Sequence, residues 1–439
     1  MGKPEEFHII ELGPGSGKLM SDFLRMAGRM PGFYKALTLH MVDVSPALKL
    51  RQAKSLGAQP PAGLKLSVEL FSGSEGEAGA QATLQIPVGP KVSWYASLGS
   101  VPPLGPNLIL AHELFDALPV HQFTYTAEGW RELCVDVAED GAAGPDEPPF
   151  RMVTAPHVTP ALAAFLGLTG DTTQGRGTGV SPREADTVQA LLSGQDEADL
   201  SAANDLWTSI QDVAARLEAL EQQGGGQAPS SPLPHPPSGD DPASSETYAA
   251  LRVGSQTNKL RMAAGKEGDV VEFSPAAAGL AYEIASRVAL FGGGALIVDY
   301  GHNHAAGASV RGIKDHKFVS PLAFPGRTDL SVDVDFSQLA HAAKTAGGIS
   351  VQGPITQSEF LQRMGIVERL QQIVDTEGIS KSIVPGESDK EAVMSQVERL
   401  VSPDAMGSIY KFMAFISQEA ADADAGEVPG FPPPPESER

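Results

Sequence analysis

The segment FHIIELGPGSG, residues Phe7–Gly17, runs from an apolar stretch into a turn with glycine at every second position. A short apolar run that ends in a glycine turn is typical of a buried parallel strand. Because glycine has no Cβ, Gly13 and Gly15 let the backbone approach a ligand, and Gly17 permits close packing of a helix on the strand. Apolar residues then recur at helical spacing over residues 19–27. We therefore expect a strand, a ligand-binding turn and a helix, in that order.

The same alternation continues through the first third of the chain. Strand-like runs occupy residues 37–43, 92–95 and 107–111. A helix is expected to open at Ser45, an N-cap residue, with Pro46 in its first turn. Alternating strands and helices indicate an α/β fold, here a doubly wound and mostly parallel sheet of the Rossmann-like kind.

The glycine turn favours one kind of cofactor. Its G-x-G-x-G spacing differs from the G-x-G-x-x-G spacing favoured for the pyrophosphate of a dinucleotide. Glu11 precedes the turn and would repel a pyrophosphate, but a carboxylate suits the amino-acid end of S-adenosylmethionine, which carries a sulfonium and an ammonium and no phosphate. The pattern therefore predicts S-adenosylmethionine as cofactor, with Glu11, Gly13, Gly15 and Gly17 as binding residues.

Asp43 stands at the end of the next predicted strand. A carboxylate at this position can accept hydrogen bonds from both ribose hydroxyls of a nucleoside. Enzymes that bind NAD use the same device, so Asp43 predicts nucleoside binding rather than methyl transfer in particular. The alternative is an acidic residue that only precedes the Ser45 helix cap.

Two further carboxylates follow the strand at 107–111, in the sequence HELFDALP over residues 112–119. Ligands of a doubly wound sheet bind outside the carboxyl ends of its strands, so Glu113 and Asp116 are expected to face the methyl acceptor. Carboxylates hold a guanidinium through paired, charge-assisted hydrogen bonds, and one of them can take the proton as the nitrogen is alkylated. A loop cap and a solvated charge stay open as the alternative for this pair.

Composition narrows the function further. The chain has 439 residues and a net charge of −22, which argues against nucleic acid and anionic lipid as partners. It contains no long uncharged apolar run, so we expect no transmembrane helix. The single cysteine, Cys134, allows no internal disulfide and fits a reducing compartment. We interpret His302, His304 and His316 as ordinary loop histidines, because their spacing matches no metal site.

The chain is expected to divide into five segments, because a stretch rich in glycine, proline and serine interrupts the ordered pattern. They are 1–137, the N-terminal half of the core with the cofactor site; 138–168, an acidic loop and connecting helix; 169–255, a disordered low-complexity insertion; 256–418, the C-terminal part of the core with substrate-side additions; and 419–439, a disordered proline-rich tail.

With these motifs in hand, the chain resembles the MidA-type methyltransferases. The matching stretches are ELGPGSG at 11–17, VSPAL at 44–48, SWY at 93–95, ELFDALPVHQF at 113–123, VEFSP at 271–275, LIVDYG at 296–301, FPGRTDL at 324–330, DVDF at 333–336 and FLQRMGI at 360–366. They run through nearly the whole ordered chain, and the stretch at 113–123 is the most specific of them.

The resemblance implies a class I methyltransferase core with helical and β-hairpin additions that belong to the family. The mitochondrial member of this family is a complex I assembly factor that methylates protein arginine. The resemblance therefore implies the mitochondrial matrix as location and an arginine of a complex I subunit as target. The expected partner is a protein substrate, and a homodimer is a further option.

Three departures from the family accompany this resemblance. We expect the chain to lack the family's N-terminal region, which carries a glycine- and aspartate-bearing segment beside the cofactor, together with any transit peptide. Asp43 stands where the family commonly has glutamate, and this exchange keeps the carboxylate. The insertion at 169–255 has an unusual composition.

Three other functions stay open on the sequence. They are a methyltransferase with a small-molecule acceptor, a non-catalytic assembly chaperone on the same fold, and a nicotinamide dehydrogenase. The glycine spacing disfavours the dehydrogenase. The presence of Glu11, the glycine turn and Asp43 argues against a chaperone with a decayed site.

Overall fold

The computed structural model of this chain describes residues 5–73, 79–138, 150–165, 265–305, 307–375, 387–423 and 428–433. The chain divides into two compact units. Unit 1 comprises Met1–Leu118, Ala277–Asn303 and Asp333–Arg439, and unit 2 comprises Pro119–Ala276 and His304–Val332. The predicted insertion at 169–255 lies outside the described residues.

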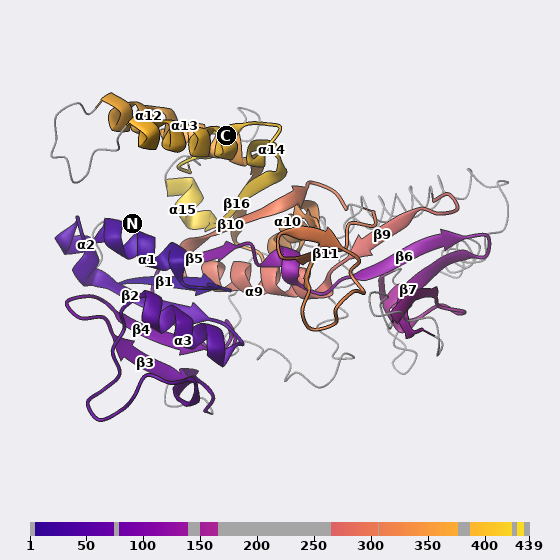
Figure 1. Cartoon of the computed structure of the whole chain (residues 1–439), viewed down its shortest axis with the longest axis horizontal. Coiled ribbons are helices and arrows are strands. Elements are labelled where there is room, and N and C mark those ends of the chain that lie inside the picture. The colour runs from indigo at the N-terminus through magenta and orange to yellow at the C-terminus, as the bar shows by residue number, and fades with distance from the viewer. Residues whose placement is uncertain are drawn as a thin grey trace, which may run out of the picture. The chain divides into compact units, whose positions relative to one another are not determined.

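Unit 1 is built on a nine-stranded sheet with the order β15-β16-β10-β5-β1-β2-β4-β3, and β14 pairs with β10. Its strands are β1 (Phe7–Leu12), β2 (Leu37–Val42), β3 (Ala82–Gln85), β4 (Lys91–Tyr95), β5 (Asn107–His112), β10 (Gly293–His302), β14 (Val334–Asp335), β15 (Ile349–Thr356) and β16 (Tyr410–Ser417). The run from β10 to β4 is parallel throughout, and β3, β15 and β16 add antiparallel edges. The predicted doubly wound sheet is confirmed (Figure 1).

Helices cover both faces of this sheet because successive strand residues point to opposite sides. Ile9 of β1 packs in the core formed with α1 (Lys18–Ala27) and α3 (Pro46–Ser55). Its neighbour Ile10 packs in the core formed with α9 (Pro275–Phe291) and α10 (Phe336–Thr345). Both side chains are fully buried. The near-continuous apolar run of β1 is thus explained by burial on two faces.

Further helices belong to unit 1. They are α2 (Pro31–Ala36), the 3-10 helices η1 (Val68–Phe71) and η3 (Phe115–Ala117), α11 (Gln357–Arg363), α12 (Ile366–Asp375), α13 (Glu387–Val401), α14 (Met406–Ile409) and α15 (Gln418–Ala423). No helix among the described residues is long and apolar enough to cross a bilayer.

The segment predicted as a disordered tail differs from the structure in its described part. Phe431 is only 6% exposed and packs against Phe360, with ring centroids 5.5 Å apart. A buried aromatic side chain anchors backbone that its proline-rich neighbours alone would leave unfixed. The prediction of a disordered tail over 419–439 therefore does not extend to Phe431 or to α15.

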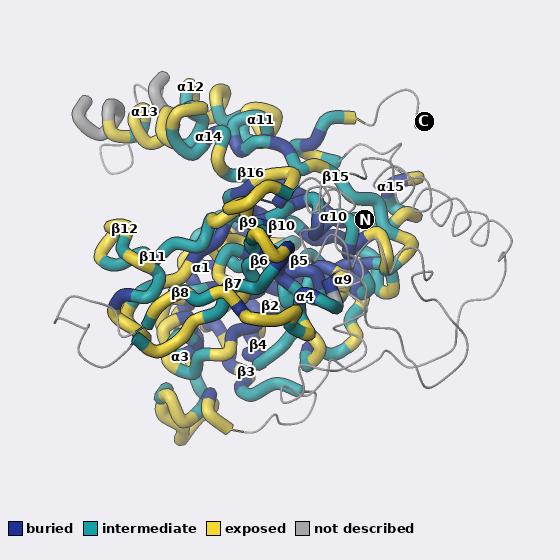
Figure 2. The backbone as a smooth tube through the Cα atoms, turned by 90° about the vertical axis from the view of Figure 1, so that its right-hand side faces the viewer, coloured by how far each residue is buried: buried dark blue, intermediate teal, exposed yellow. Residues whose placement is uncertain are grey.

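Unit 2 is made of antiparallel strands. One sheet has the order β8-β7-β6-β9 and contains β6 (His121–Thr126), β7 (Gly129–Val137), β8 (Phe150–Thr154) and β9 (Val270–Phe273), with α4 (Pro160–Phe165) packed in its core. The other has the order β12-β11-β13 and contains β11 (Arg311–Lys314), β12 (Lys317–Val319) and β13 (Asp329–Ser331). Figure 2 shows β12 as largely exposed and strand β2 of unit 1 as largely buried.

The units divide the chain differently from the predicted segments. The first predicted segment, 1–137, includes β6 and β7, which belong to unit 2. The second and fourth predicted segments, 138–168 and 256–418, likewise contribute strands to unit 2. The reason is that β6 pairs with β9, more than a hundred residues away, and sequence spacing does not reveal such a pairing.

A chain of buried polar groups spans three neighbouring strands of unit 1, β1, β2 and β4. His40 Nε2 lies 3.2 Å from His8 Nδ1, and His40 Nδ1 lies 3.2 Å from the hydroxyl of Tyr95. Burial, together with nearby positive charges, lowers the pKa of His40 to about 3. The His40 imidazole is therefore neutral in the folded protein at neutral pH.

This depressed pKa makes folding depend on pH. An unfolded chain protonates His40 near pH 6.5 and the folded chain does not, so stability is complete above that pH and is lost as pH falls toward 3. We expect His40 alone to cost about 1.4 kcal/mol of unfolding free energy per pH unit below about pH 6. The free energy of unfolding, measured with urea at pH values from 7 to 4, should fall less steeply with pH in His40→Gln than in the wild type. Equal slopes would contradict this account.

Candidate active site

The glycine turn after β1 requires glycine for steric reasons. Gly13, Gly15 and Gly17 have φ angles of 60°, 52° and 76°, in the left-handed region. A Cβ on Gly13 would lie 2.7 Å from Leu114 Cδ1, and one on Gly17 would lie 3.1 Å from Gln52 Cα. A Cβ on Gly15 would meet no atom within 4 Å. The turn is thus packed at both ends and open in the middle, as a ligand-binding turn needs to be.

Glu11 is the last but one residue of β1 and is only 3% exposed. Its Oε2 atom has no hydrogen-bond partner among the residues that the structure describes. Burial raises the pKa of this carboxyl to about 7. A buried carboxyl group without a donor fits a site for a cationic ligand, because a positive charge would supply what the protein does not.

Asp43 follows β2 and lies beside the same turn. Its Oδ1 accepts from the Ser45 amide at 2.9 Å, and its Oδ2 accepts from Gln52 Nε2 at 2.7 Å. The hydroxyl of Ser45 itself caps α3, accepting from the Leu48 amide at 3.3 Å. Each oxygen of a carboxylate can accept more than one hydrogen bond, so these contacts fix Asp43 and leave acceptor capacity for ribose hydroxyls.

Gln52 is a residue that the sequence did not single out. It is fully buried, and its Nε2 donates to the Gly15 carbonyl at 3.0 Å as well as to Asp43. Its Oε1 accepts from Trp94 Nε1 at 3.0 Å. Trp94 belongs to the SWY stretch, but nothing in the sequence pattern marks Gln52 on α3. This one amide therefore ties the glycine turn to Asp43.

The acidic loop after β5 carries the two predicted acceptor residues. Glu113 has a φ of 49°, which is unusual for a residue with a side chain, and its Oε1 accepts from the Tyr410 hydroxyl at 2.7 Å. The hydroxyl of Tyr300 donates to Asp116 Oδ2. Both predicted carboxylates are thus held by tyrosines rather than solvated as isolated charges.

Asp299 lies behind this loop and was not predicted as a site residue. It is fully buried, and its Oδ2 accepts from the amides of Leu114, Phe115 and Asp116 at 3.2, 2.9 and 3.3 Å. Burial and the charge of Asp116 raise its pKa to about 8 despite these donors. Through its three hydrogen bonds, Asp299 fixes the backbone of residues 114–116 in the acidic loop.

The structure brings the two parts of the candidate site together. Leu114 packs against Gly13, so the acidic loop adjoins the glycine turn at the carboxyl ends of β1 and β5. All seven predicted site residues therefore lie at the carboxyl ends of the neighbouring strands β5, β1 and β2 of unit 1. Within the described ranges, no group of histidine, cysteine or acidic residues is arranged to hold a metal ion. His302 Nε2 instead lies 3.4 Å from Asp333 Oδ2.

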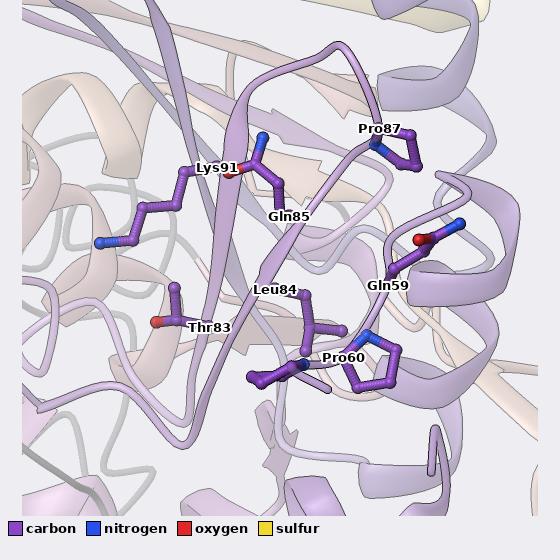
Figure 3. A pocket seen from close by; sticks show the side chains of 8 residues that line it. Gln59, Pro60, Thr83, Leu84, Gln85, Pro87 and Lys91 are labelled. Carbon is purple, nitrogen blue, oxygen red and sulfur yellow. The ribbon is translucent and has the colours of Figure 1, made fainter. Parts of the chain in front are cut away.

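A separate pocket of about 330 Å³ lies beside β3 (Figure 3). It is lined by Gln59, Pro60, Pro61, Thr83, Leu84, Gln85, Pro87 and Lys91. Lys91 opens β4, whereas the candidate site lies where the parallel strands end. The pocket is therefore at the other end of β4 and does not belong to the candidate site.

Comparison with known proteins now identifies the family. Residues 1–196 and 208–355 match the family described as "Putative S-adenosyl-L-methionine-dependent methyltransferase". The chain belongs to this family. The predicted enzyme class, an S-adenosylmethionine-dependent methyltransferase, and the predicted cofactor are confirmed. The family assignment also excludes the nicotinamide dehydrogenase.

Curated relatives match nearly the whole chain. The human protein named "Protein arginine methyltransferase NDUFAF7, mitochondrial" is 29% identical over 420 residues, which cover 95% of this chain and 68% of the relative. Its Drosophila melanogaster homologue is 29% identical over 432 residues, which cover 98% of this chain and 72% of the relative. The expected resemblance to the MidA-type family is confirmed by these matches.

Two solved structures from Burkholderia thailandensis share the fold. One, an uncharacterized protein, has a TM-score of 0.52 with 20% identity and covers 94% of this chain and 74% of its own. The other, described as a probable methyl transferase bound to S-adenosyl-homocysteine, has a TM-score of 0.53 with 20% identity and covers 94% and 72%. At this identity the likeness bears on the fold alone.

The raised pKa of Glu11 generates a prediction for cofactor binding. Below about pH 7 the free protein holds a proton on Glu11, and a bound cation favours the ionised form. Binding of S-adenosylhomocysteine, which keeps the ammonium, should therefore release a proton. We expect the affinity to rise up to about tenfold per pH unit as pH increases toward 7, and to level off above it.

Calorimetric titration of the wild type and of Glu11→Gln between pH 5.5 and pH 8.5 checks this prediction. The variant should bind S-adenosylhomocysteine more weakly above pH 7. Below pH 7, its affinity should rise less steeply with pH than that of the wild type. The same slope in both proteins would show that Glu11 does not contact the cationic end of the cofactor.

Proposed function

We propose that this chain is a protein arginine methyltransferase of the mitochondrial matrix that modifies an arginine of a complex I subunit. The relatives named above are called protein arginine methyltransferases and mitochondrial, which supports the reaction and the organelle. The matrix and complex I follow from the resemblance to the MidA-type family. The observation that carries the proposal is the pair of tyrosine-held carboxylates, Glu113 and Asp116, on the loop whose Leu114 lies against Gly13 of the glycine turn.

We assign the cofactor to the glycine turn. Glu11 would face its cationic amino-acid end, Gly13, Gly15 and Gly17 would let it approach the backbone, and Asp43 would accept from its ribose hydroxyls. The unpartnered Oε2 of Glu11 and the open space at Gly15 support this assignment. When bound, S-adenosylmethionine supplies an electrophilic methyl group.

The remaining chemistry falls to the acidic loop. Glu113 and Asp116 would accept N–H donors of the substrate guanidinium, which fixes the plane of the nucleophile. Direct displacement requires alignment of nucleophile and methyl group, so this orientation is the main contribution of the protein. One of the two carboxylates would then take the proton that the alkylated nitrogen loses.

The alternatives predict different outcomes. A methyltransferase with a small-molecule acceptor would bind the cofactor and leave protein arginine unmodified. A non-catalytic assembly chaperone would support complex I assembly even without a competent cofactor site. The homodimer expected as an option is checked by light scattering of the same purified protein.

The proposal is tested with complex I subunits from cells that lack the endogenous enzyme. Purified protein and labelled S-adenosylmethionine should transfer methyl groups to arginine, identified by mass spectrometry of the subunits. Glu113→Gln and Asp116→Asn should each lower kcat about 100-fold or more, because each removes a charge that orients or deprotonates the acceptor. Their dissociation constants for S-adenosylhomocysteine should stay within about twofold of the wild type.

Glu359→Gln serves as a control, because Glu359 is a partly exposed residue of α11 that pairs with Arg363. It should retain wild-type kcat. Methylation absent from arginine in the wild-type reaction, or unchanged by both acidic-loop substitutions, would refute the proposal.

A further inference from the structure

Two tyrosines on neighbouring strands contact the two acceptor carboxylates. Tyr300 of β10 and Tyr410 of β16 are directly opposite each other in an antiparallel pair. Their rings meet edge to face, with centroids 5.7 Å apart and an interplanar angle of 74°. The Tyr410 hydroxyl donates to Glu113 at 2.7 Å, and the Tyr300 hydroxyl donates to Asp116. One cross-strand pair thus reaches both carboxylates, although Tyr410 is 297 residues from Glu113 in the chain.

We propose that Tyr300 and Tyr410 are positioning residues that hold Asp116 and Glu113 in the conformations that receive the acceptor guanidinium. This inference rests on the proposed function, in which those carboxylates bind the substrate. It assigns no contact with the substrate to the tyrosines themselves. They act through the carboxylates.

The backbone of the loop shows why such support is needed. Asp299 fixes the amides of residues 114–116, but these three hydrogen bonds do not hold the side chain of Glu113. A glutamate has three rotatable side-chain bonds, and the left-handed φ of Glu113 does not restrict them all. A hydroxyl that donates to one carboxylate oxygen removes most of this freedom before the substrate arrives. Preorganisation of this kind lowers the cost of reaching the reactive geometry.

The hydroxyl of Tyr410 is suited to this task because it stays protonated. Burial, and then the hydrogen bond and charge of Glu113, raise the pKa of Tyr410 far above its usual value. The phenol therefore stays protonated and remains a donor at neutral pH. Its ring packs at the margin of the cluster that contains Phe360 and Phe412, so a phenylalanine can take its place without loss of packing.

Double-mutant cycles test the inference on activity. Tyr410→Phe should lower kcat/KM for the protein acceptor about tenfold, with the affinity for S-adenosylhomocysteine and the thermal midpoint unchanged. In a Glu113→Gln background the same change should cost nothing further, whereas in an Asp116→Asn background it should keep its tenfold cost. Tyr300→Phe should show the mirror pattern, coupled to Asp116. Tyr282→Phe, an exposed tyrosine on α9, should behave as the wild type.

Crystal structures of the wild type and of Tyr410→Phe give a readout that does not need an acceptor. Glu113 should adopt one conformer in the wild type and several in the variant, while residues 114–116 keep their backbone positions. A single unchanged Glu113 conformer in the variant, or costs that add in every background, would overturn the inference. If the wild type methylates no arginine but Glu113 loses its order in the variant, the proposed substrate fails and the positioning role stands.

Discussion

The whole site depends on a turn that has no room for side chains at its two ends. Gly13 and Gly17 adopt left-handed backbone angles, and a Cβ on either would collide with Leu114 or approach the backbone of Gln52. This tight packing joins β1 to the acidic loop on one side and to α3 on the other. The middle of the turn, at Gly15, stays open. In a parallel sheet, the turns that follow the strands lie together at the carboxyl ends of those strands. Every residue assigned to the reaction lies there.

Around the turn, each residue proposed to meet a ligand is held by another that does not. Gln52 holds Asp43, and Asp299 holds the backbone of the acidic loop. Tyr410 holds Glu113. Glu11 is the exception, because its buried oxygen has no partner in the described chain. The protein thus fixes the groups that must be oriented, and leaves unsatisfied the one group that a cation would satisfy.

The sequence predicts the residues proposed to face the ligands, but it does not predict the residues that hold them in place. Glu11, the glycine turn and Asp43 belong to one strand-turn-helix-strand unit, so their proximity follows from local pattern and short connections. Gln52 has no signal because glutamine on a helix is ordinarily a surface residue, and only the partners that it meets in the folded chain make it a buried one. Asp299 and Tyr410 are separated from the acidic loop by 184 and 297 residues, and only the order of strands in the sheet brings them to it. The unit boundary at Leu118 was missed for the same reason, since β6 pairs with β9 rather than with a neighbour in sequence.

The most direct test of the account is a crystal structure of this chain with S-adenosylhomocysteine. The ligand should lie across the carboxyl ends of β1 and β2, with its ammonium against Glu11, its ribose hydroxyls on Asp43 and its sulfur toward Glu113 and Asp116. Density for the ligand in the pocket beside β3, or with its amino-acid end away from Glu11, would contradict the account.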